Sequence, residues 1–435
     1  MNSLNFMSKI KKVWSREILD SRAVPTVETA IQLDDDSIAV ASVPSGASTG
    51  TFEAHELRDG DEKRYLGKGV LKAVDNVNRV IAPSLVGLDP MDQAGLDRKL
   101  IELDGTANKE KLGANSILSV SICALRSAAV SQNISVYSWV QTLAQNLDIK
   151  TNLDIPTPIF NMINGGLHGA GNLDFQEFFV IPASSLPYHT GLENCVSIYH
   201  KLKENLAAKG AIHSVGDEGG YAPNLFTNVD ALSIIVETVK EAGFIIGKDV
   251  FLGLDIAAST FYKDGKYSVR DRSTPLDTDG MITLCGALYD QYHLAILEDP
   301  LYEDDWEGWT KLTKTFGEKS LIVGDDLLVT NSERVNRGIK EKACNAILVK
   351  PNQIGTISEM LKVVSISRSA NWKVIVSHRS GETNDSTIAD IAVGIGADYV
   401  KFGAPARGER VAKYNRLLTI ETELGIKKQE VTQKK

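Results

Sequence analysis

Six short apolar stretches in the second half of the chain each end at a titratable side chain. The stretch 346–349 (Ala-Ile-Leu-Val) runs directly into Lys350. A continuous apolar run of this kind predicts a strand that is buried on both faces. A single lysine at such a strand end could simply extend its amine into water. Five further stretches repeat the pattern, which favours a shared chemical role for the residues that end them: Asp255, Glu298, Asp325, Lys350, His378 and Lys401.

The spacing of these residues indicates how the strands are connected. From Glu298 to Lys401 the consecutive steps are 27, 25, 28 and 23 residues. Each step accommodates one strand, one helix and two short loops. Two earlier strand-like stretches, 158–162 and 177–181, bring the number of strands to eight. The sequence therefore predicts a (β/α)8-type barrel over residues 149–435, with irregular first strands and the active site at the carboxyl rim of the strands.

The first third of the chain has a different pattern. Strand-like stretches at 26–31 and 38–41 predict a hairpin, and residues 68–82, 91–103, 115–132 and 135–147 predict helices. Strands followed by helices without alternation are typical of a small α+β domain. We therefore predict an N-terminal α+β capping domain over residues 1–148. Its loop 44–50 contains almost only small residues and is either a plain connection or a mobile lid over the site.

Bulk properties exclude several classes of function. The net charge of −9 and the pI near 5.4 argue against nucleic acid as the main partner, although local cations could still bind an anionic substrate. We find no apolar run of membrane-spanning length and no secretory signal. The four cysteines lack metal-type spacing, and we expect buried free thiols in a reducing compartment.

Asp255, Glu298 and Asp325 end three successive strands and are candidate metal ligands. Three facing carboxylates without a cation would repel one another or take up protons, so a divalent ion is the natural partner. Oxygen-only ligation favours Mg²⁺ over zinc. The alternative is a set of separate salt bridges to neighbouring lysines.

Acid and base groups accompany this candidate metal site. Lys350 and Lys401 should lie near the cation, and both burial and positive neighbours would lower a lysine pKa and create a neutral base. Glu177 and Glu218 could supply an acid if crowding by other carboxylates keeps one of them protonated.

Phosphate recognition is predicted from the stretch that follows His378. Arg379 and Ser380 offer a bidentate cation and a hydroxyl group, which suit a phosphate. His168, in a glycine-rich loop, is a candidate substrate contact. A metal, a lysine base, an opposed acid and a phosphate grip together indicate proton abstraction α to a carboxylate with loss of a β-leaving group.

Specific stretches support this interpretation, and through them the chain resembles the enolase family from about Arg16 to Leu424. They are residues 17–22 (Glu-Ile-Leu-Asp-Ser-Arg), 45–50 (Ser-Gly-Ala-Ser-Thr-Gly), 216–220 (Gly-Asp-Glu-Gly-Gly), 298–300 (Glu-Asp-Pro), 350–355, 377–382 and 403–407. The sequence departs from the family pattern at Ala23-Val24, where Gly-Asn is usual, and at Thr419, where an arginine takes part in subunit contacts.

The resemblance implies a role for each candidate residue. Two Mg²⁺ ions are expected per active site, and the second arrives with the substrate and is held with help from Ser48 on the lid. Lys350 would be the base at C2, and Glu218, backed by Glu177, would assist loss of the C3 hydroxyl. The first metal ion would be held by Asp255, Glu298 and Asp325, and the phosphate would be bound by Arg379 and Ser380. Lys401 would bind the carboxylate region of the substrate. His168 would contact its far end, and His378 would make a further substrate contact.

The resemblance also implies a reaction and partners. It implies the reversible dehydration of 2-phospho-D-glycerate to phosphoenolpyruvate in glycolysis and gluconeogenesis, in a cytoplasmic homodimer or octamer. Some bacterial enolases are also secreted or displayed on the cell surface, where lysines bind plasminogen. Lys434-Lys435 is compatible with such a role, although a solvated basic tail is the simpler explanation.

Three alternatives remain open. A relative acting on an unphosphorylated carboxylate would need neither Ser48 nor the pair Arg379 and Ser380. A Schiff-base aldolase using Lys350 would leave the three carboxylate strand ends unexplained. A non-catalytic binding protein on the same scaffold would be expected to have lost Lys350 or a metal ligand, and neither is lost.

Overall fold

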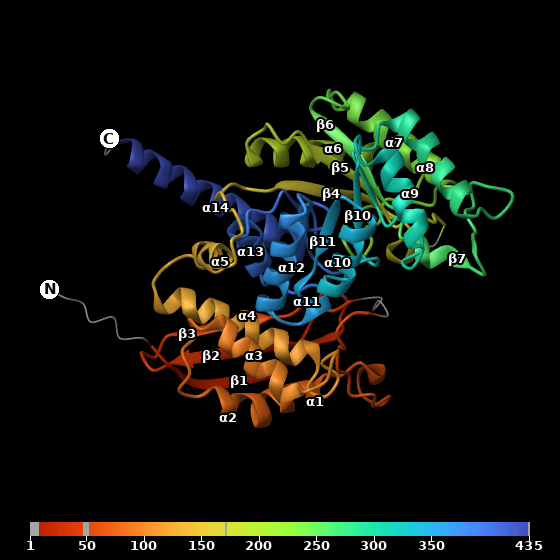
Figure 1. Cartoon of the computed structure of the whole chain (residues 1–435). Helices are drawn as coiled ribbons and strands as arrows, with labels where there is room; N and C mark the ends of the chain where they lie inside the picture. The colour runs from red at the N-terminus through yellow and green to blue at the C-terminus, as the bar shows by residue number, and fades with distance from the viewer. Residues whose placement is uncertain (1–7, 47–51, 170–171, 434–435) are drawn as a thin grey trace.

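The computed structural model of the protein describes residues 8–46, 52–169 and 172–433. It consists of a small N-terminal domain and a closed eight-stranded barrel surrounded by helices (Figure 1). This confirms the predicted fold class. The segment between the last helix of the first domain and the first barrel strand spans residues 146–156, and the domain boundary at residues 148/149 remains a prediction.

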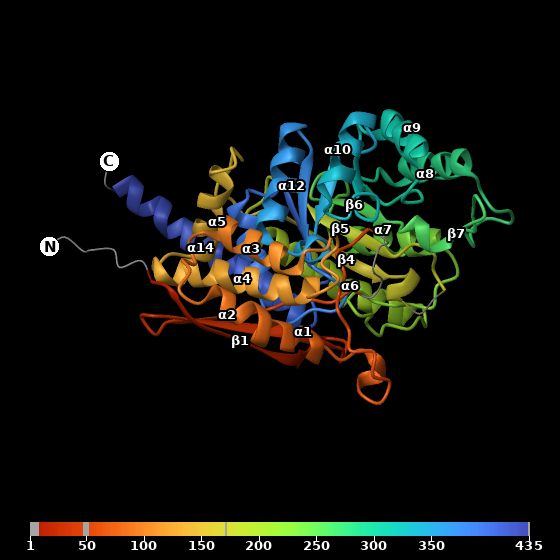
Figure 2. The same cartoon turned by 60° about the horizontal axis from the view of Figure 1, so that its bottom comes forward.

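The N-terminal domain is built on a three-stranded antiparallel sheet in the order β1-β2-β3, comprising β1 (Ile10–Leu19), β2 (Pro25–Leu33) and β3 (Ile38–Ser42). The hairpin expected from the sequence is β2–β3. Helices lie along the sheet, and Figure 2 shows them layered over it. They are α1 (Leu71–Asn76), continued by a π-helical turn (Val77–Ile81) and α2 (Ala82–Leu85), then α3 (Gln93–Asp104), α4 (Ala114–Ser131) and α5 (Val136–Gln145).

The turn between β1 and β2 contains Ala23 in the left-handed region, with φ 57°. Asp20 Oδ1 accepts hydrogen bonds from the backbone N–H groups of Arg22 and Val24 and so fixes the turn. A Cβ atom in this conformation costs of order 1 kcal/mol. Alanine thus occupies a turn position whose backbone conformation glycine adopts more readily.

The barrel closes in the order β10-β11-β12-β13-β4-β5-β6-β9. All neighbours are parallel except at β5, which runs antiparallel to both β4 and β6 and accounts for the irregular start that the sequence predicted. The strands are β4 (Thr157–Asn164), β5 (Glu177–Pro182), β6 (Val250–Asp255), β9 (Ile296–Glu298), β10 (Leu321–Gly324), β11 (Ala346–Val349), β12 (Lys373–Ser377) and β13 (Tyr399–Lys401); a separate short hairpin pairs β7 (Tyr262–Lys263) with β8 (Lys266–Tyr267).

Helices cover the outside of the barrel, and alternate strand residues fill its inside. Leu348 points into a central cluster with Ile159, Phe179 and Ile375, whereas Ile347 belongs to the larger core between strands and helices. The strands are therefore buried on both faces, as the apolar runs predicted. The helices are α6 (Tyr188–Ala208), α7 (Asn228–Glu241), α8 (Thr278–Tyr292), α9 (Trp306–Phe316), α10 (Ser332–Glu341), α11 (Pro351–Ile354), α12 (Ile357–Ser369), α13 (Thr387–Gly394) and α14 (Gly408–Gln433).

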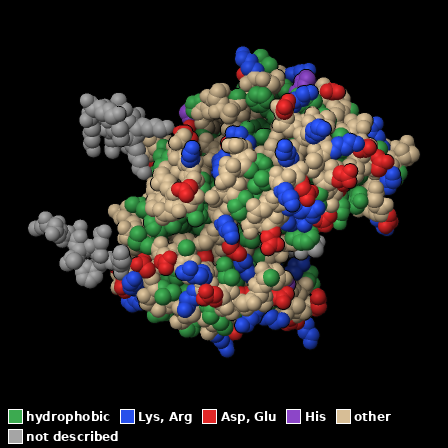
Figure 3. Space-filling model, viewed as in Figure 1, with side chains coloured by type: hydrophobic (Ala, Val, Ile, Leu, Met, Phe, Trp, Pro, Cys, Tyr) green, Lys and Arg blue, Asp and Glu red, His purple; other side chains and the backbone are tan. Residues whose placement is uncertain are grey.

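Helix α4 is long and apolar enough to cross a membrane by length and composition, but 83% of it is buried inside the protein. It packs on β2 and β3 and is therefore a core helix. All four cysteines are buried and free, as predicted. On the face drawn in Figure 3, side chains of both charge signs are interspersed.

The two domains are joined by buried polar contacts at the start of α12. Asp97 in α3 accepts hydrogen bonds from the backbone N–H and the hydroxyl of Ser358, at 2.8 and 2.6 Å, and from the Ser121 hydroxyl at 2.6 Å. Lys109 forms an ion pair with Glu359 at 3.0 Å. The capping domain is thus attached directly behind the strand end that carries Lys350.

Candidate active site

A polar pocket opens at the rim where the predicted residues converge. Of the predicted site residues that the structure describes, all but Glu298 line it, and Glu298 lies behind Lys401 as its ion-pair partner. The lining residues are Glu53, His168, Gln176, Glu177, Glu218, Asp255, Ala257, Thr260, Asp299, Asp325, Asp326, Lys350, Ser377, His378, Arg379, Ser380 and Lys401.

Strand register brings three carboxylates into one row. Glu177, the first residue of β5, pairs with Asp255, the last of β6, and Asp255 pairs with Glu298, the last of β9. Glu177 reaches this rim because β5 runs opposite to its neighbours, so that its beginning lies where the other strands end. All three side chains are almost completely buried.

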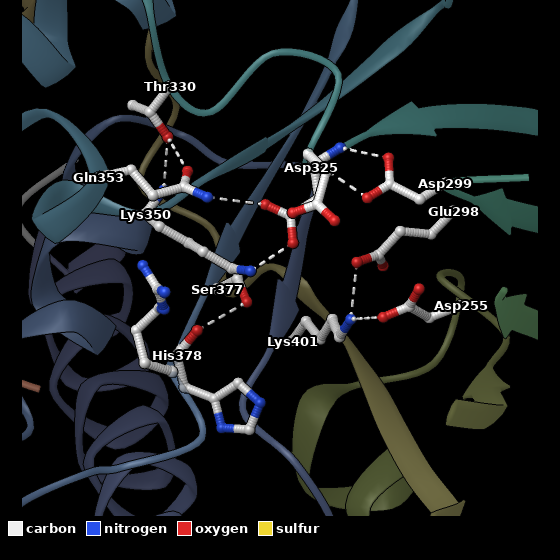
Figure 4. Close-up of polar contacts among 12 residues, drawn as sticks. Asp255, Glu298, Asp299, Asp325, Thr330, Lys350, Gln353, Ser377, His378 and Lys401 are labelled. Atoms are coloured by element: carbon white, nitrogen blue, oxygen red, sulfur yellow. Dashed lines mark hydrogen bonds and ion pairs between the residues drawn. The ribbon is translucent and has the colours of Figure 1, made fainter. Parts of the chain in front are cut away.

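Lys401, at the end of β13, neutralises part of this row. Its Nζ lies 2.6 Å from Glu177. It also lies 3.1 Å from Asp255 and 2.7 Å from Glu298 (Figure 4). Burial and the neighbouring carboxylates nevertheless raise the pKa of Asp255, and they raise the pKa of Glu298 well above its usual value. One lysine is therefore too little positive charge for the row, and the carboxylates retain an affinity for a further cation or for protons.

Lys350 forms an ion pair with Asp325 across the rim (Figure 4). Burial is the largest influence and would lower the pKa of Lys350, but the nearby carboxylates, Asp325 foremost and Glu298 as well, together raise it above its usual value. Without a metal ion the arrangement therefore favours the charged lysine, and the neutral lysine expected beside a cation stays a prediction. Asp325 shows the reciprocal effect, and Lys350 holds its pKa below the usual value.

Two acidic residues missed by the sequence interpretation lie beside Asp325. Asp299 and Asp326 each offer an oxygen that lies within 4.8 Å of one from Asp325, so these three could hold a metal ion. Burial and the carboxylate of Asp325 raise the pKa of Asp326 to about 7. Asp299 accepts hydrogen bonds from the backbone N–H groups of Asp325 and Asp326 at 3.0 and 2.8 Å. Their adjacency to Glu298 and Asp325 in the sequence was a signal that could have identified them.

Glu218 lies in a second acidic group on another wall of the pocket. His168 Nδ1 is 3.5 Å from both Glu177 and Glu218, and His378 Nε2 is 3.2 Å from Glu218. Burial is the largest influence and would raise the pKa of Glu218, but His168, a hydrogen bond with Glu177, and the positive charges of Arg410 and Lys401 together lower it. The same carboxylates raise the pKa of His168 despite its burial. The surroundings therefore favour the ionised form of Glu218 and not the protonated acid that crowding was expected to produce.

His378 is kept neutral by its surroundings. Burial lowers its pKa well below the usual value, and the nearby charge of Arg410 adds to this effect. Arg410, which is fully buried, donates to His378 Nδ1 at 2.7 Å and to the backbone oxygens of Arg379 and Ser380, both at 2.6 Å. Because Nδ1 accepts this bond, Nε2 carries the hydrogen and faces Glu218. Arg410 was missed from the sequence although it lies three residues beyond the matched stretch 403–407.

Arg379 is paired with the capping domain. Its Nη1 lies 2.8 Å from Glu53, a residue just beyond the lid loop. Ser380 accepts a hydrogen bond at 3.2 Å from Arg22, whose guanidinium also contacts the backbone oxygens of Ser45 and Gly46. The two predicted phosphate ligands are therefore connected to both ends of the lid loop.

The base of the lid loop is anchored more firmly than its composition suggested. Ser45 is fully buried, forms a β-bridge with Gly381, and donates its hydroxyl hydrogen to Asp20 at 2.5 Å. The loop's small residues allow this close approach to the barrel. Ser48, the predicted ligand of a second metal ion, lies outside the described residues.

The donor set is suited to a hard divalent cation. Asp255 Oδ1 is buried and has no hydrogen-bond partner among the described residues. Carboxylate oxygens dominate the row and its surroundings, and oxygen ligands are those that Mg²⁺ prefers. Among the described residues, two groups have ligand atoms close enough together to share one ion: Asp299, Asp325 and Asp326, and separately His168, Glu177 and Glu218. The predicted set of Asp255, Glu298 and Asp325 is not one of these groups, since Lys401 and Lys350 pair with its oxygens, and it stays a prediction.

This fold and this site define a class: a barrel with an N-terminal capping domain whose strand carboxyl rim gathers acidic and basic side chains in one polar pocket. Comparison with protein-family models narrows that class. Residues 10–140 match the model described as "Enolase, N-terminal domain", and residues 152–434 match "Enolase, C-terminal TIM barrel domain". The chain belongs to the enolase family, and this membership makes it a metal-dependent lyase.

Proposed function

We propose that the protein is a phosphopyruvate hydratase, a carbon–oxygen lyase that reversibly dehydrates 2-phospho-D-glycerate to phosphoenolpyruvate. The observation that carries this proposal is the division of one pocket into three parts. Lys350 lies on one side with Asp325, Glu218 lies on another with His168, and Arg379 and Ser380 contact Glu53 and Arg22 of the capping domain.

Asp255, Glu298 and Asp325 would hold the first Mg²⁺, and Ser48 would help to hold a second that arrives with the substrate. Bound Mg²⁺ supplies positive charge that offsets its ligands and stabilises the dianionic enediolate formed by proton removal. With the charge of Asp325 offset, burial and the positive charges of Arg379 and Lys401 are left to lower the pKa of Lys350.

The remaining steps belong to the chain's own residues. Lys350 takes the proton from C2 of the substrate, and Lys401 binds its carboxylate region. Arg379 and Ser380 bind the phosphate, for which Arg379 exchanges its pairing with Glu53. Glu218, backed by Glu177, assists departure of the C3 hydroxyl, and His168, whose Nδ1 lies 3.5 Å from both, contacts that end of the substrate together with His378.

A coupled assay tests the proposal. Purified protein should form phosphoenolpyruvate from 2-phosphoglycerate in the presence of Mg²⁺ and lose this activity when Mg²⁺ is chelated. Asp255→Asn should abolish the Mg²⁺-dependent activity while the protein stays folded. Absence of turnover by the folded wild-type protein at saturating Mg²⁺ would contradict the proposed reaction.

We further propose a role in glycolysis and gluconeogenesis in the cytoplasm and a homodimeric or octameric assembly. Thr419 is exposed on α14, and Arg416, one turn earlier, is engaged within the chain by Asp390 at 2.6 Å. Because Arg416 is already paired within the chain, it is not available to take the place of an arginine at position 419 in a subunit contact. Sedimentation measurements would establish the assembly. A plasminogen-binding surface role remains an expectation from the resemblance alone, since Lys434-Lys435 lies outside the described residues.

A further inference from the structure

A closed ring of hydrogen bonds joins the Lys350 backbone to its own amine through two side chains without an assigned role, Thr330 and Gln353 (Figure 4). The Lys350 backbone N–H donates to Thr330 Oγ1 at 3.0 Å, and Thr330 Oγ1 donates to Gln353 Oε1 at 2.7 Å. Gln353 Nε2 donates to Asp325 Oδ1 at 3.0 Å, and Lys350 Nζ donates to Asp325 Oδ2. Thr330 is fully buried and Gln353 is 1% exposed.

The chemistry of the ring fixes the direction of every bond. A backbone N–H can only donate, so Thr330 must accept there and is left to donate to Gln353. A carboxylate can only accept, so Gln353 must present its NH₂ group to Asp325. A hydroxyl followed by an amide satisfies both ends, whereas an apolar side chain at either position would break the ring. The ring therefore depends on residue type, which general packing would not require.

The backbone around Thr330 is held in a conformation that its residues rarely adopt. Val329 and Thr330 have φ values of 41° and 52°, and both are β-branched and buried. Strained positions of this kind persist when the surroundings over-determine them, and they cluster at functional sites. Here the strained turn aims the Thr330 hydroxyl at the point where β11 ends.

The ring also reaches the capping domain. The backbone N–H of Ala54 donates to the backbone carbonyl of Gln353 at 2.8 Å, and the side-chain NH₂ group of Gln353 lies 3.5 Å from the Glu53 carboxylate. Gln353 thus lies between the segment that follows the lid loop and the pair formed by Lys350 and Asp325.

We propose that Thr330 and Gln353 are positioning residues that fix the Lys350 amine and the Asp325 carboxylate relative to each other. The inference rests on the proposed function, in which Lys350 is the base. A lysine side chain has many rotamers, and small misplacement of a reacting group can cost about 100-fold in rate. Anchoring the backbone of Lys350 and its ion-pair partner to the same two side chains removes much of that freedom.

Paired substitutions separate positioning from packing. Thr330→Val keeps the shape and removes the hydroxyl, and it should lower kcat about 10- to 100-fold with KM within about threefold. Thr330→Ser restores the hydroxyl and should recover kcat to within about threefold of wild type. Thr238→Val makes the same change at a buried threonine in α7 that accepts from Asn205 at 3.0 Å, and it should leave kcat unchanged.

A second readout needs neither metal nor substrate. In metal-free protein, modification of Lys350 by a small amine-reactive reagent, followed by mass spectrometry, should be several-fold faster in Thr330→Val than in wild type or Thr330→Ser. If Thr330→Val does not fold, Gln353→Met opens the ring at another point, since it removes the hydrogen bonds of Gln353 to Thr330 and to Asp325, and it should change kcat and Lys350 reactivity in the same direction. The inference would be overturned if Thr330→Val and Gln353→Met kept the wild-type kcat and Lys350 reactivity. It would also be overturned if Thr330→Ser lowered kcat as much as Thr330→Val does. A wild-type protein without turnover would instead contradict the proposed function, and the labelling comparison would still test the ring.

Discussion

Lys350 and Glu218 serve opposite ends of the proposed reaction, and each is held by a different partner. Lys350 is paired with Asp325, and Glu218 lies within 3.5 Å of both His168 and His378. Because these two groups do not contact each other, removing one should leave the environment of the other largely intact. Their roles should therefore be separable by single substitutions.

We predict that Lys350→Ala stops exchange of the C2 proton of 2-phosphoglycerate with solvent, with a loss of about 100-fold or more, because the base is gone. Glu218→Gln should retain part of this exchange but lose elimination, because assistance to the leaving hydroxyl is removed. Deuterium incorporation followed by NMR measures exchange, and the coupled assay measures elimination. Equal loss of exchange in both variants would show that the two roles cannot be divided in this way.

At the scale of elements, the lid loop and the strand ends behave differently. The strand ends are fixed by barrel register, whereas the loop is tied down before residue 47 at Ser45, by Asp20 and Gly381, and Glu53 beyond it pairs with Arg379. Ser48 lies between these two anchors in the sequence, outside the described residues.

We predict that hydrogen exchange at residues 47–51 slows only when a substrate analogue and Mg²⁺ are present together, because only then does Ser48 gain something to coordinate. The backbone N–H of Ser45, which donates to the Gly381 carbonyl at 2.8 Å, should be protected in every state and serves as the internal control. Full protection of 47–51 in the free enzyme would mean that the loop is a fixed connection without a gating role.

At the scale of the whole molecule, the two domains share a buried polar contact region at the start of α12. Asp97 is fully buried and accepts four hydrogen bonds, from Gln93, Ser121 and the two groups of Ser358. Loss of these hydrogen bonds would leave the backbone N–H and the hydroxyl of Ser358, at the start of α12, without an acceptor in the contact between the domains. The capping domain and the barrel should therefore unfold together.

We predict that Asp97→Ala lowers the free energy of unfolding by about 2–4 kcal/mol, since several buried donors lose their acceptor at once. Urea denaturation followed by circular dichroism measures the change. Asp92→Ala, which removes an exposed N-cap from the same helix, is the control and should cost about 1 kcal/mol. If the two variants lost equal stability, the contact would not join the domains energetically.

The carboxylates also predict how stability depends on pH. In the metal-free protein the pKa of Asp326 is raised to about 7 by burial and Asp325, and burial raises the pKa of Asp255 and Glu298 as well. A carboxyl group with a raised folded-state pKa stabilises the fold below its unfolded pKa of about 4, and this contribution is lost as pH rises. For Asp326 the loss extends to about pH 7.

We therefore expect the Tm of metal-free protein to fall between about pH 5 and pH 8, and Mg²⁺ to raise Tm more at pH 8 than at pH 5, since ligands must be deprotonated. Thermal unfolding with and without Mg²⁺ measures both effects. Asp326→Asn should flatten the pH dependence. A Mg²⁺ effect that is equal at both pH values would argue against binding by these carboxylates.

The sequence by itself determined the order of the barrel strands and the residues that end them. Apolar runs of strand length, repeated at a βα spacing, leave few other folds, and the residue after each run is then placed at one rim whatever the details. Lys350, Asp325 and Asp255 could therefore be assigned to one pocket before any contact was known. The motif stretches also indicated the enolase family, because residue types and their spacing can be read directly from the sequence.

Only the tertiary structure decided the direction of β5, the charge state of the lysine and the role of Thr330. An apolar strand carries no mark of its direction, yet that direction puts Glu177 beside Asp255. The pKa of Lys350 depends on its distance to Asp325, which the sequence does not contain; without a metal ion this pKa is raised, and the lowered value expected beside a cation stays a prediction. Thr330 lies 20 residues before Lys350, and only the fold brings its hydroxyl to the backbone of that lysine.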